Sequence, residues 1–229
     1  MMNIKRHIPN FITLLNLSCG CMASVMAFEG FYTQAFLFMV GSLIFDFLDG
    51  FAARLLKSYS DMGRELDSLA DVVSFGFVPG VLMWHIGGGF YFGFLITLFS
   101  ALRLAKFNVD TREHDVFYGL ATPASAIFFC SIAFVIENMP TSFVAVAMSN
   151  EIVRWVLVVL FAYLMICDLP MFSLKFKSWG VKDNALVYGF LLCSLIAIVV
   201  FGVLSLPFII LSYIVLSVLL KVGGKRCIE

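Results

Sequence analysis

The sequence predicts an all-α protein, a polytopic integral membrane helical bundle with about eight transmembrane helices and both termini in the cytoplasm. Its 229 residues are 62% hydrophobic and only 13% charged, which is unlike an ordinary soluble domain. Apolar runs near the roughly 20 residues needed to cross a bilayer recur along the whole chain. The basic residues also gather on one side when these runs alternate in direction.

The apolar runs define eight expected spans, separated by short polar connections. They cover about residues 8–28, 31–56, 63–84, 90–107, 119–136, 152–167, 185–201 and 206–220. Pro79 and Gly80 predict a bend in the third span, and we expect residues 137–151 to be a polar connection. Residues 1–229 are thus expected to form a single membrane domain, with catalytic helices within about 8–125 and additional spans within 150–221.

The basic residues orient these spans. If the chain starts in the cytoplasm and changes sides with every span, all but one of its 15 Lys and Arg residues lie inside, as the positive-inside rule requires. Only Arg154 lies outside. The inside set is Lys5, Arg6, Arg54, Lys57, Arg64, Arg103, Lys106, Arg112, Lys175, Lys177, Lys182, Lys221, Lys225 and Arg226. We therefore expect an inner-membrane protein.

Composition argues against several other classes of protein. The formal net charge is zero, so nothing indicates nucleic-acid binding. The six cysteines are scattered without a C-x2-C pair, and we interpret them as small packing residues rather than zinc ligands or disulfide partners. The first apolar run continues without an A-x-A-like site, so no cleavable signal peptide is expected.

Four carboxylates stand out within the apolar sequence. Asp46 and Asp49 are three residues apart, and Asp67 and Asp71 four apart, so each pair shares one face of a helix. A hairpin through residues 57–62 would make the pairs face one another. Carboxylates that meet in a mostly dry place repel unless cations lie between them, and oxygen ligands favour Mg²⁺ or Mn²⁺. The assignment of the basic residues to the cytoplasmic side also places this acidic window, residues 46–71, near the cytoplasmic surface.

The residues around the carboxylates suit a phosphate-containing ligand. Gly50, Ala53 and Gly63 carry little or no side chain, which lets a ligand or a backbone approach closely. Arg54 adds a guanidinium that can grip phosphate oxygens. A structural alternative is a buried ion network in which Arg54, Lys57 and Arg64 pair with the acids, but three bases leave negative charge uncompensated.

The chemistry expected from such a site is direct group transfer. No Ser-His or Cys-His arrangement lies near the acidic window, so a covalent intermediate is not expected. Phosphoryl-type transfer depends on positioning and on charge neutralisation by metal ions. Intramembrane carboxylates also occur in cation transporters, but transport sites usually lie near the bilayer midplane, whereas these acids cluster at one membrane face.

The window reads D-x2-D-G-x2-A-R-x8-G-x3-D-x3-D and resembles the signature of the CDP-alcohol phosphotransferases, integral membrane enzymes of phospholipid synthesis. Every fixed position of that signature is matched, by Asp46, Asp49, Gly50, Ala53, Arg54, Gly63, Asp67 and Asp71. The resemblance implies that the four Asp hold two divalent ions, Mg²⁺ or Mn²⁺, and that Asp71 doubles as the general base. It also implies a homodimer in the lipid bilayer.

Flanking segments within the first 125 residues are similar to bacterial and archaeal family members that transfer a phosphatidyl group from CDP-diacylglycerol to L-serine. The segments are residues 8–10, 13–17, 19–20, 66–71, 74–76, 103–108 and 119–124. One departure is Ala121, where those members are expected to have proline. The alternative is a sister enzyme that uses glycerol 3-phosphate or an inositol phosphate, but a phosphate dianion calls for a denser basic pocket.

Two further groups are candidates for substrate contact. Arg103, Lys106 and Asn108 close the fourth span and are candidates for binding the acceptor, although Arg103 and Lys106 are equally suited to anchoring that span. Thr13 and Asn16 lie three residues apart on the first span and are candidates for hydrogen bonds to the nucleotide. Their alternative role is hydrogen bonding between helices.

Overall fold

The computed structural model describes residues 7–89, 91–109, 118–172 and 185–222, and this part of the chain is helical, with no named strand. Its long helices are α1 (Ile8–Phe28), α2 (Tyr32–Leu56), α3 (Asp61–Asp71), α4 (Val78–Ile86), α5 (Phe94–Val109), α6 (Thr122–Asn138), α8 (Glu151–Ile166), α9 (Ala185–Phe201) and α10 (Ser205–Val222). Shorter pieces are η2 (Val72–Phe77), η3 (Tyr91–Gly93), α7 (Phe143–Ser149) and η4 (Gly202–Leu204). The all-α prediction is confirmed for these residues.

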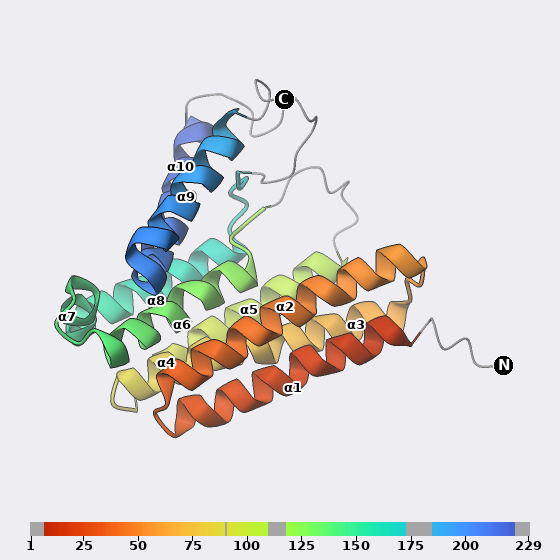
Figure 1. The fold of residues 1–229 in the computed structure, drawn as a ribbon, viewed down its shortest axis with the longest axis horizontal. Coiled ribbons are helices and arrows are strands. Elements are labelled where there is room, and N and C mark those ends of the chain that lie inside the picture. The colour runs from red at the N-terminus through yellow and green to blue at the C-terminus, as the bar shows by residue number, and fades with distance from the viewer. Residues whose placement is uncertain (1–6, 90, 110–117, 173–184, 223–229) are drawn as a thin grey trace.

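The helices form a bundle to which the last hairpin is added at one side. In Figure 1, α1 to α6 and α8 run roughly side by side, whereas α9 and α10 lean steeply away from them. α1 packs along the length of α2 and also contacts α3, while α2 and α3 scarcely contact each other. Both acid-bearing helices are therefore held against a third helix.

The predicted hairpin between the acid-bearing helices is present. α2 ends because Lys57 adopts a left-handed conformation (φ 49°), which is a common way to terminate a helix. α3 begins at Asp61 after Ser60, whose Oγ accepts a hydrogen bond from the Gly63 N–H at 3.0 Å. Ser60 is thus a typical N-cap, and four residues turn the chain between the two helices.

A π-helical segment, η2, connects α3 to α4 immediately after Asp71. Such segments are rare and often mark functional sites. The sequence predicted a bend at Pro79 and Gly80, but the irregular backbone lies one turn earlier. Thr97 of α5 donates a hydrogen bond from its Oγ1 to the Gly76 carbonyl at 3.0 Å. A side chain thereby satisfies a backbone group that an α-helix would pair internally.

Two clusters of buried side chains form the core. One joins α1, α2, η2, α4 and α6 around Phe36, Met39 and Phe75, and the other joins α5, α6, α8 and α10 around Phe128, Phe129 and Phe161. The second cluster corrects one expectation. Residues 137–151 were predicted to be a polar connection, but α7 lies within them, because Val144 and Met148 are buried against that cluster.

The membrane prediction is supported in its coarser form. Five helical segments of the described residues are long and apolar enough to cross a bilayer, or six if α6 and α7, bent by 102°, count as one span. The crossing count of eight and the placement of both termini stay predictions. Several basic residues used for that orientation lie outside the described residues: Lys5, Arg6, Arg112, Lys175, Lys177, Lys182, Lys225 and Arg226.

Candidate active site

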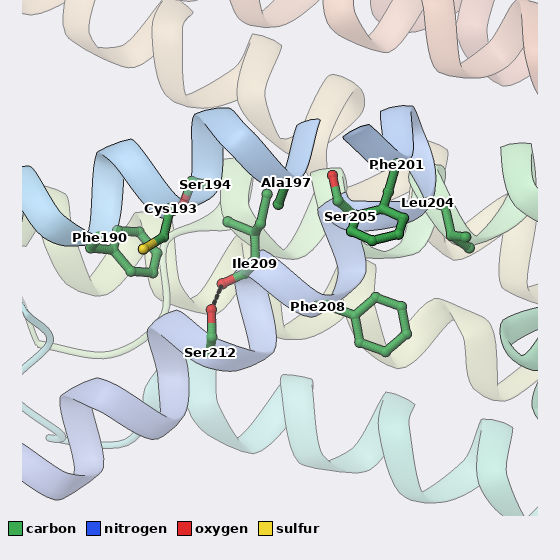
Figure 2. A pocket seen from close by; sticks show the side chains of 10 residues that line it. All are labelled: Phe190, Cys193, Ser194, Ala197, Phe201, Leu204, Ser205, Phe208, Ile209 and Ser212. Atoms are coloured by element: carbon green, nitrogen blue, oxygen red, sulfur yellow. Dashed lines mark hydrogen bonds between the residues drawn. The ribbon is translucent and has the colours of Figure 1, made fainter. Parts of the chain in front are cut away.

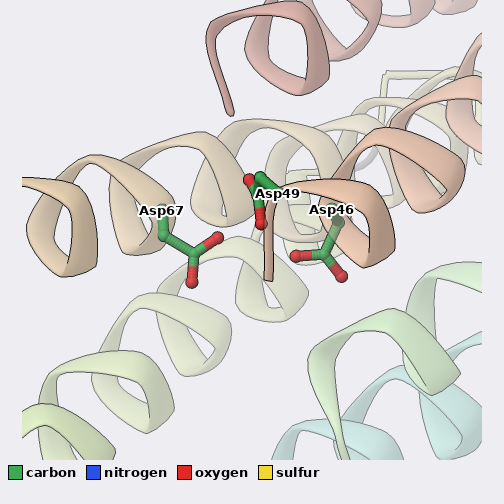
Figure 3. Close-up of side chains that lie close together, drawn as sticks. All are labelled: Asp46, Asp49 and Asp67. Carbon is green, nitrogen blue, oxygen red and sulfur yellow. The ribbon is translucent and has the colours of Figure 1, made fainter. Parts of the chain in front are cut away.

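Three of the four predicted carboxylates converge. Asp46 and Asp49 on α2 and Asp67 on α3 each direct a carboxylate oxygen into a group whose atoms lie within 4.8 Å of one another. Figure 3 shows the Asp49 carboxylate between the other two. Oxygens that share one divalent cation at about 2.0–2.6 Å have comparable mutual distances. The hairpin thus produces the face-to-face arrangement that the residue spacing predicted.

The oxygen atoms of this acidic cluster, defined as Asp46, Asp49 and Asp67, are suited to a metal ion. Asp49 is only 6% exposed, and its Oδ2 is buried without a hydrogen-bond partner in the described part of the chain. The same is true of Asp67 Oδ1. A buried carboxylate oxygen without a partner is costly, and a hard divalent cation would supply the missing partner.

The alternative of a buried ion network does not describe the arrangement. The Nε of Arg54 donates to the Gly50 carbonyl at 3.0 Å, and Arg64 forms an exposed ion pair with Glu65 at 3.6 Å. Within the described residues, no lysine or arginine forms an ion pair with the acidic cluster. Its negative charge is therefore left for a ligand to balance.

Asp71 lies one turn beyond Asp67 but is held differently. It is 8% exposed, and its Oδ1 accepts a hydrogen bond from the Asn16 Nδ2 of α1 at 3.4 Å. Asp71 is not among the three residues whose oxygens converge within 4.8 Å. The structure therefore separates the four acids into a convergent group of three and a fourth carboxylate that α1 holds.

A cavity of about 250 Å³ opens beside the acidic cluster, between α1, α2 and α3. Asp49 and Asp67 form part of its wall, and so do four residues predicted to contact the nucleotide: Thr13, Gly50, Ala53 and Gly63. A side chain added at Gly50 would meet nothing within 4 Å, so that glycine leaves open space. Arg54 and Asn16 are not among the lining residues.

The cavity also brings in residues that the sequence analysis did not assign to the site. Arg64 lines it, and so do Asn10 and Ser60. Arg64 was considered for this site only as a charge-balancing base, because it is not one of the fixed signature positions, to which Arg54 belongs. The Asn10 Oδ1 would lie 3.0 Å from a Cβ added at Gly63, so Asn10 reaches across from α1 to α3. The sequence signal that could have identified Asn10 was its place in the segment 8–10, one of the flanking segments noted in the sequence analysis.

The three acceptor candidates have different surroundings. Arg103 is half-buried, its Nε has no hydrogen-bond partner in the described part of the chain, and it interacts electrostatically with Asp71 and Tyr213. Lys106 is exposed, and its Nζ lies 2.9 Å from Asp168 Oδ1. Asn108 donates from Nδ2 to the Ser68 Oγ at 2.9 Å. Only Arg103 thus has a described interaction with one of the four acids.

A larger cavity, of about 500 Å³, lies between α9 and α10. Figure 2 shows that aromatic and aliphatic side chains such as Phe190, Phe201 and Phe208 line it, and that its Ser212 Oγ donates to the Ile209 carbonyl at 2.8 Å. The lining contains no carboxylate or basic side chain. A charged ligand therefore suits the smaller, acidic cavity better than this apolar one.

Comparisons with known proteins match the part of the chain that carries the acidic cluster. The sequence profile of the CDP-alcohol phosphatidyltransferase family matches residues 6–163. The chain is 34% identical over 134 residues to the CDP-diacylglycerol–serine O-phosphatidyltransferase of Bacillus subtilis, which covers 56% of this chain and 76% of that protein. It is 31% identical over 191 residues to the protein of the same name from Helicobacter pylori strain 26695, covering 80% and 79%. The archaetidylserine synthase of Methanothermobacter thermautotrophicus is 31% identical over 163 residues, covering 65% and 70%.

Proposed function

Because the chain belongs to the CDP-alcohol phosphatidyltransferase family, we propose that it transfers the phosphatidyl group of CDP-diacylglycerol to L-serine, giving phosphatidylserine and CMP. The observation that carries this proposal is the acidic cluster, two of whose members, Asp49 and Asp67, line a cavity between α1, α2 and α3 and each carry a buried carboxylate oxygen without a hydrogen-bond partner in the described part of the chain. The names of the relatives from Bacillus and Helicobacter supply the donor and the acceptor.

The acidic cluster would hold the divalent ions, Mg²⁺ or Mn²⁺, of which we propose two, with Asp71 beside them as the fourth carboxylate. When bound, these ions supply positive charge against the diphosphate and the departing CMP. The four acids lie on two helices that a third helix holds. The protein's own contribution is therefore to fix the carboxylates before the substrate arrives.

The cavity would hold the nucleotide end of the donor. Gly50, Ala53 and Gly63 leave space along its wall, and Thr13 and Arg64 add polar groups. We propose that Arg64 contacts phosphate oxygens from within the cavity, because a guanidinium binds phosphate in a bidentate manner. Arg54, which lies back along α2 toward the Gly50 carbonyl, would act from the rim.

Serine would approach from the side of Arg103. This cation interacts with Asp71, so it could bind the serine carboxylate while Asp71 takes the proton from the serine hydroxyl. The serine oxygen then forms a bond to the phosphatidyl phosphorus, and the bond from that phosphorus to the CMP oxygen breaks. In the structure Lys106 and Asn108 contact Asp168 and Ser68, so a role in binding the acceptor would require them to exchange those partners.

The membrane setting completes the proposal. We propose eight crossings with both termini in the cytoplasm, an inner-membrane location and a homodimer. α1 begins and α2 ends at the same end of the bundle (Figure 1), and Asp49 lies seven residues before the end of α2. At that end a water-soluble nucleotide and a lipid tail can reach one site together.

The deciding experiment measures CMP release by the purified protein from CDP-diacylglycerol, with L-serine, glycerol 3-phosphate or an inositol phosphate as the acceptor. We expect release with serine, its loss with a chelator and its return with Mg²⁺ or Mn²⁺. Release with glycerol 3-phosphate but not with serine would overturn the choice of acceptor. Metal-dependent ion flux in liposomes without CMP formation would instead indicate a transporter.

The role of Asp71 is tested by Asp71→Asn, which keeps the shape of the side chain but cannot accept the proton. We expect turnover to fall to background while CDP-diacylglycerol still binds, because the acidic cluster remains intact. Near-normal turnover in this variant would exclude Asp71 as the base.

A further inference from the structure

The side chain of Asn16 lies at the junction of three elements. It is 0% exposed, and its Nδ2 donates to the Asp71 Oδ1 of α3 at 3.4 Å. Its Oδ1 accepts a hydrogen bond from the Ser74 Oγ of η2 at 2.8 Å. A neutral amide buried in an apolar bundle is retained only when its groups are paired. Here the two ends of the amide have different partners.

These partners fix which way the amide points. The Ser74 hydroxyl can donate to an oxygen, whereas an ionised carboxylate can only accept. Turning the amide over would place its Oδ1 against the Asp71 Oδ1, and two acceptors would then face each other without a proton between them. Asp71 therefore requires the N–H groups of Asn16 to face it, and the Ser74 hydroxyl, which also lies 3.2 Å from the Asn16 backbone carbonyl, supports Oδ1 at the other end of the amide. The 3.4 Å distance is long for such a bond, and bonds of this kind often tighten when a substrate binds.

The backbone around this contact is built for close approach. A Cβ at Gly20 of α1 would lie 2.9 Å from the Ser74 Cα, so only glycine lets α1 come this near to η2. Ser74 stands three residues after Asp71, on the π-helical turn. That turn brings the serine hydroxyl and the carboxylate to the same asparagine.

Resting on the proposed function, we propose that Asn16 is a positioning residue: it holds the Asp71 carboxylate in the orientation that receives the proton of the acceptor hydroxyl, and Ser74 supports the other end of its amide. Asn16 does not line the nucleotide cavity. It therefore acts through Asp71 and not by contact with the donor.

The test compares Asn16→Ala and Ser74→Ala with the full-length wild-type protein. Steady-state CMP release gives kcat and the KM for CDP-diacylglycerol, and titration with Mn²⁺ alone, followed by electron paramagnetic resonance, gives metal affinity. We expect kcat to fall about 10- to 100-fold, because small misplacements of a catalytic group have effects of this size. The donor KM should stay within about twofold, since neither residue lines the donor cavity, and any loss of Mn²⁺ affinity should be smaller than that of Asp67→Asn, since neither residue belongs to the acidic cluster.

Ser42→Ala is the matched control. Ser42 is also fully buried, and its Oγ donates at 3.1 Å to the backbone carbonyl of Asn16 rather than to the side-chain amide. We expect its kcat to stay near the wild-type value. Thermal unfolding in detergent shows whether each variant is folded at the assay temperature.

Three results would overturn the proposal. A raised donor KM at unchanged kcat would place Asn16 against the nucleotide. Mn²⁺ binding as weak as that of Asp67→Asn would place it with the metal ligands. Equal losses of kcat in Ser74→Ala and Ser42→Ala would show that any loosening of α1 suffices. These outcomes are measured relative to the wild-type protein, so they are distinct from failure of the proposed function, in which the wild-type protein itself releases no CMP.

Discussion

Gly50→Ala separates folding from donor binding. Gly50 lies within α2 and lines the cavity beside Asp49, and an added Cβ would meet no atom within 4 Å. Folding should therefore not suffer, and the unfolding free energy should rise by up to about 1 kcal/mol, the difference between Gly and Ala inside a helix. The methyl group would nevertheless occupy space that the donor needs. Overpacking of a close contact costs about 1–3 kcal/mol, which corresponds to roughly a 5- to 150-fold rise in the donor KM.

Gly189→Ala provides the comparison for this experiment. Gly189 is also helical and also has nothing within 4 Å of an added Cβ, but it lies on α9, away from the acidic cavity. Both variants should gain helix stability in thermal unfolding, and only Gly50→Ala should weaken CMP release at low CDP-diacylglycerol. A normal donor KM for Gly50→Ala would refute the placement of the nucleotide in this cavity. A lowered melting temperature would refute the claim that the space is open.

Three further variants test the site and its surroundings. Asp67→Asn should reduce CMP release by at least about 100-fold and weaken Mn²⁺ binding, because loss of even an outer-shell partner of a metal ligand lowers metal affinity or activity about 10- to 100-fold. Asp61→Asn, at an exposed position on the same helix, should have neither effect. Equal effects of the two variants would contradict the assignment of Asp67 as a metal ligand. Gly20→Ala should lower the unfolding free energy by about 1–3 kcal/mol, because its Cβ would lie 2.9 Å from the Ser74 Cα; an unchanged melting temperature would show that α1 can move away freely. Ala121→Pro should raise the unfolding free energy by about 0.4–1 kcal/mol, because Ala121 directly precedes α6 and has a φ of −65°, which suits proline. A lower melting temperature would show that proline does not fit at the start of α6.

The helix positions were largely readable from hydropathy. The expected first span, 8–28, coincides with α1, and the expected seventh, 185–201, coincides with α9, because long apolar runs between polar breaks leave few other placements. α7 was missed since a seven-residue helix is too short for a periodic pattern to be distinguished from a loop. The π-helical turn of η2 was also unpredictable, because it depends on contacts from α1 and α5 rather than on its own sequence.

The candidate site was predictable as far as local spacing reaches. Asp46 and Asp49 share a face by their separation of three, and a short turn sufficed to bring Asp67 opposite them. The different setting of Asp71 depends on Asn16, which is 55 residues away in the chain. The pairing of Lys106 with Asp168, 62 residues apart, likewise has no local signal. Long-range partners of polar side chains become visible only in the folded chain.

The way in which α1 holds both α2 and α3 has a consequence for how the enzyme could be tuned. Since the two acid-bearing helices scarcely contact each other and both pack on α1, the way α1 seats them sets how Asp49 and Asp67 lie relative to each other. Larger or smaller side chains on α1 would shift α2 and α3 relative to each other. The distance between Asp49 and Asp67 would then change although neither acid is substituted. Natural variation in metal preference could therefore originate in the first helix, at positions that never meet an ion.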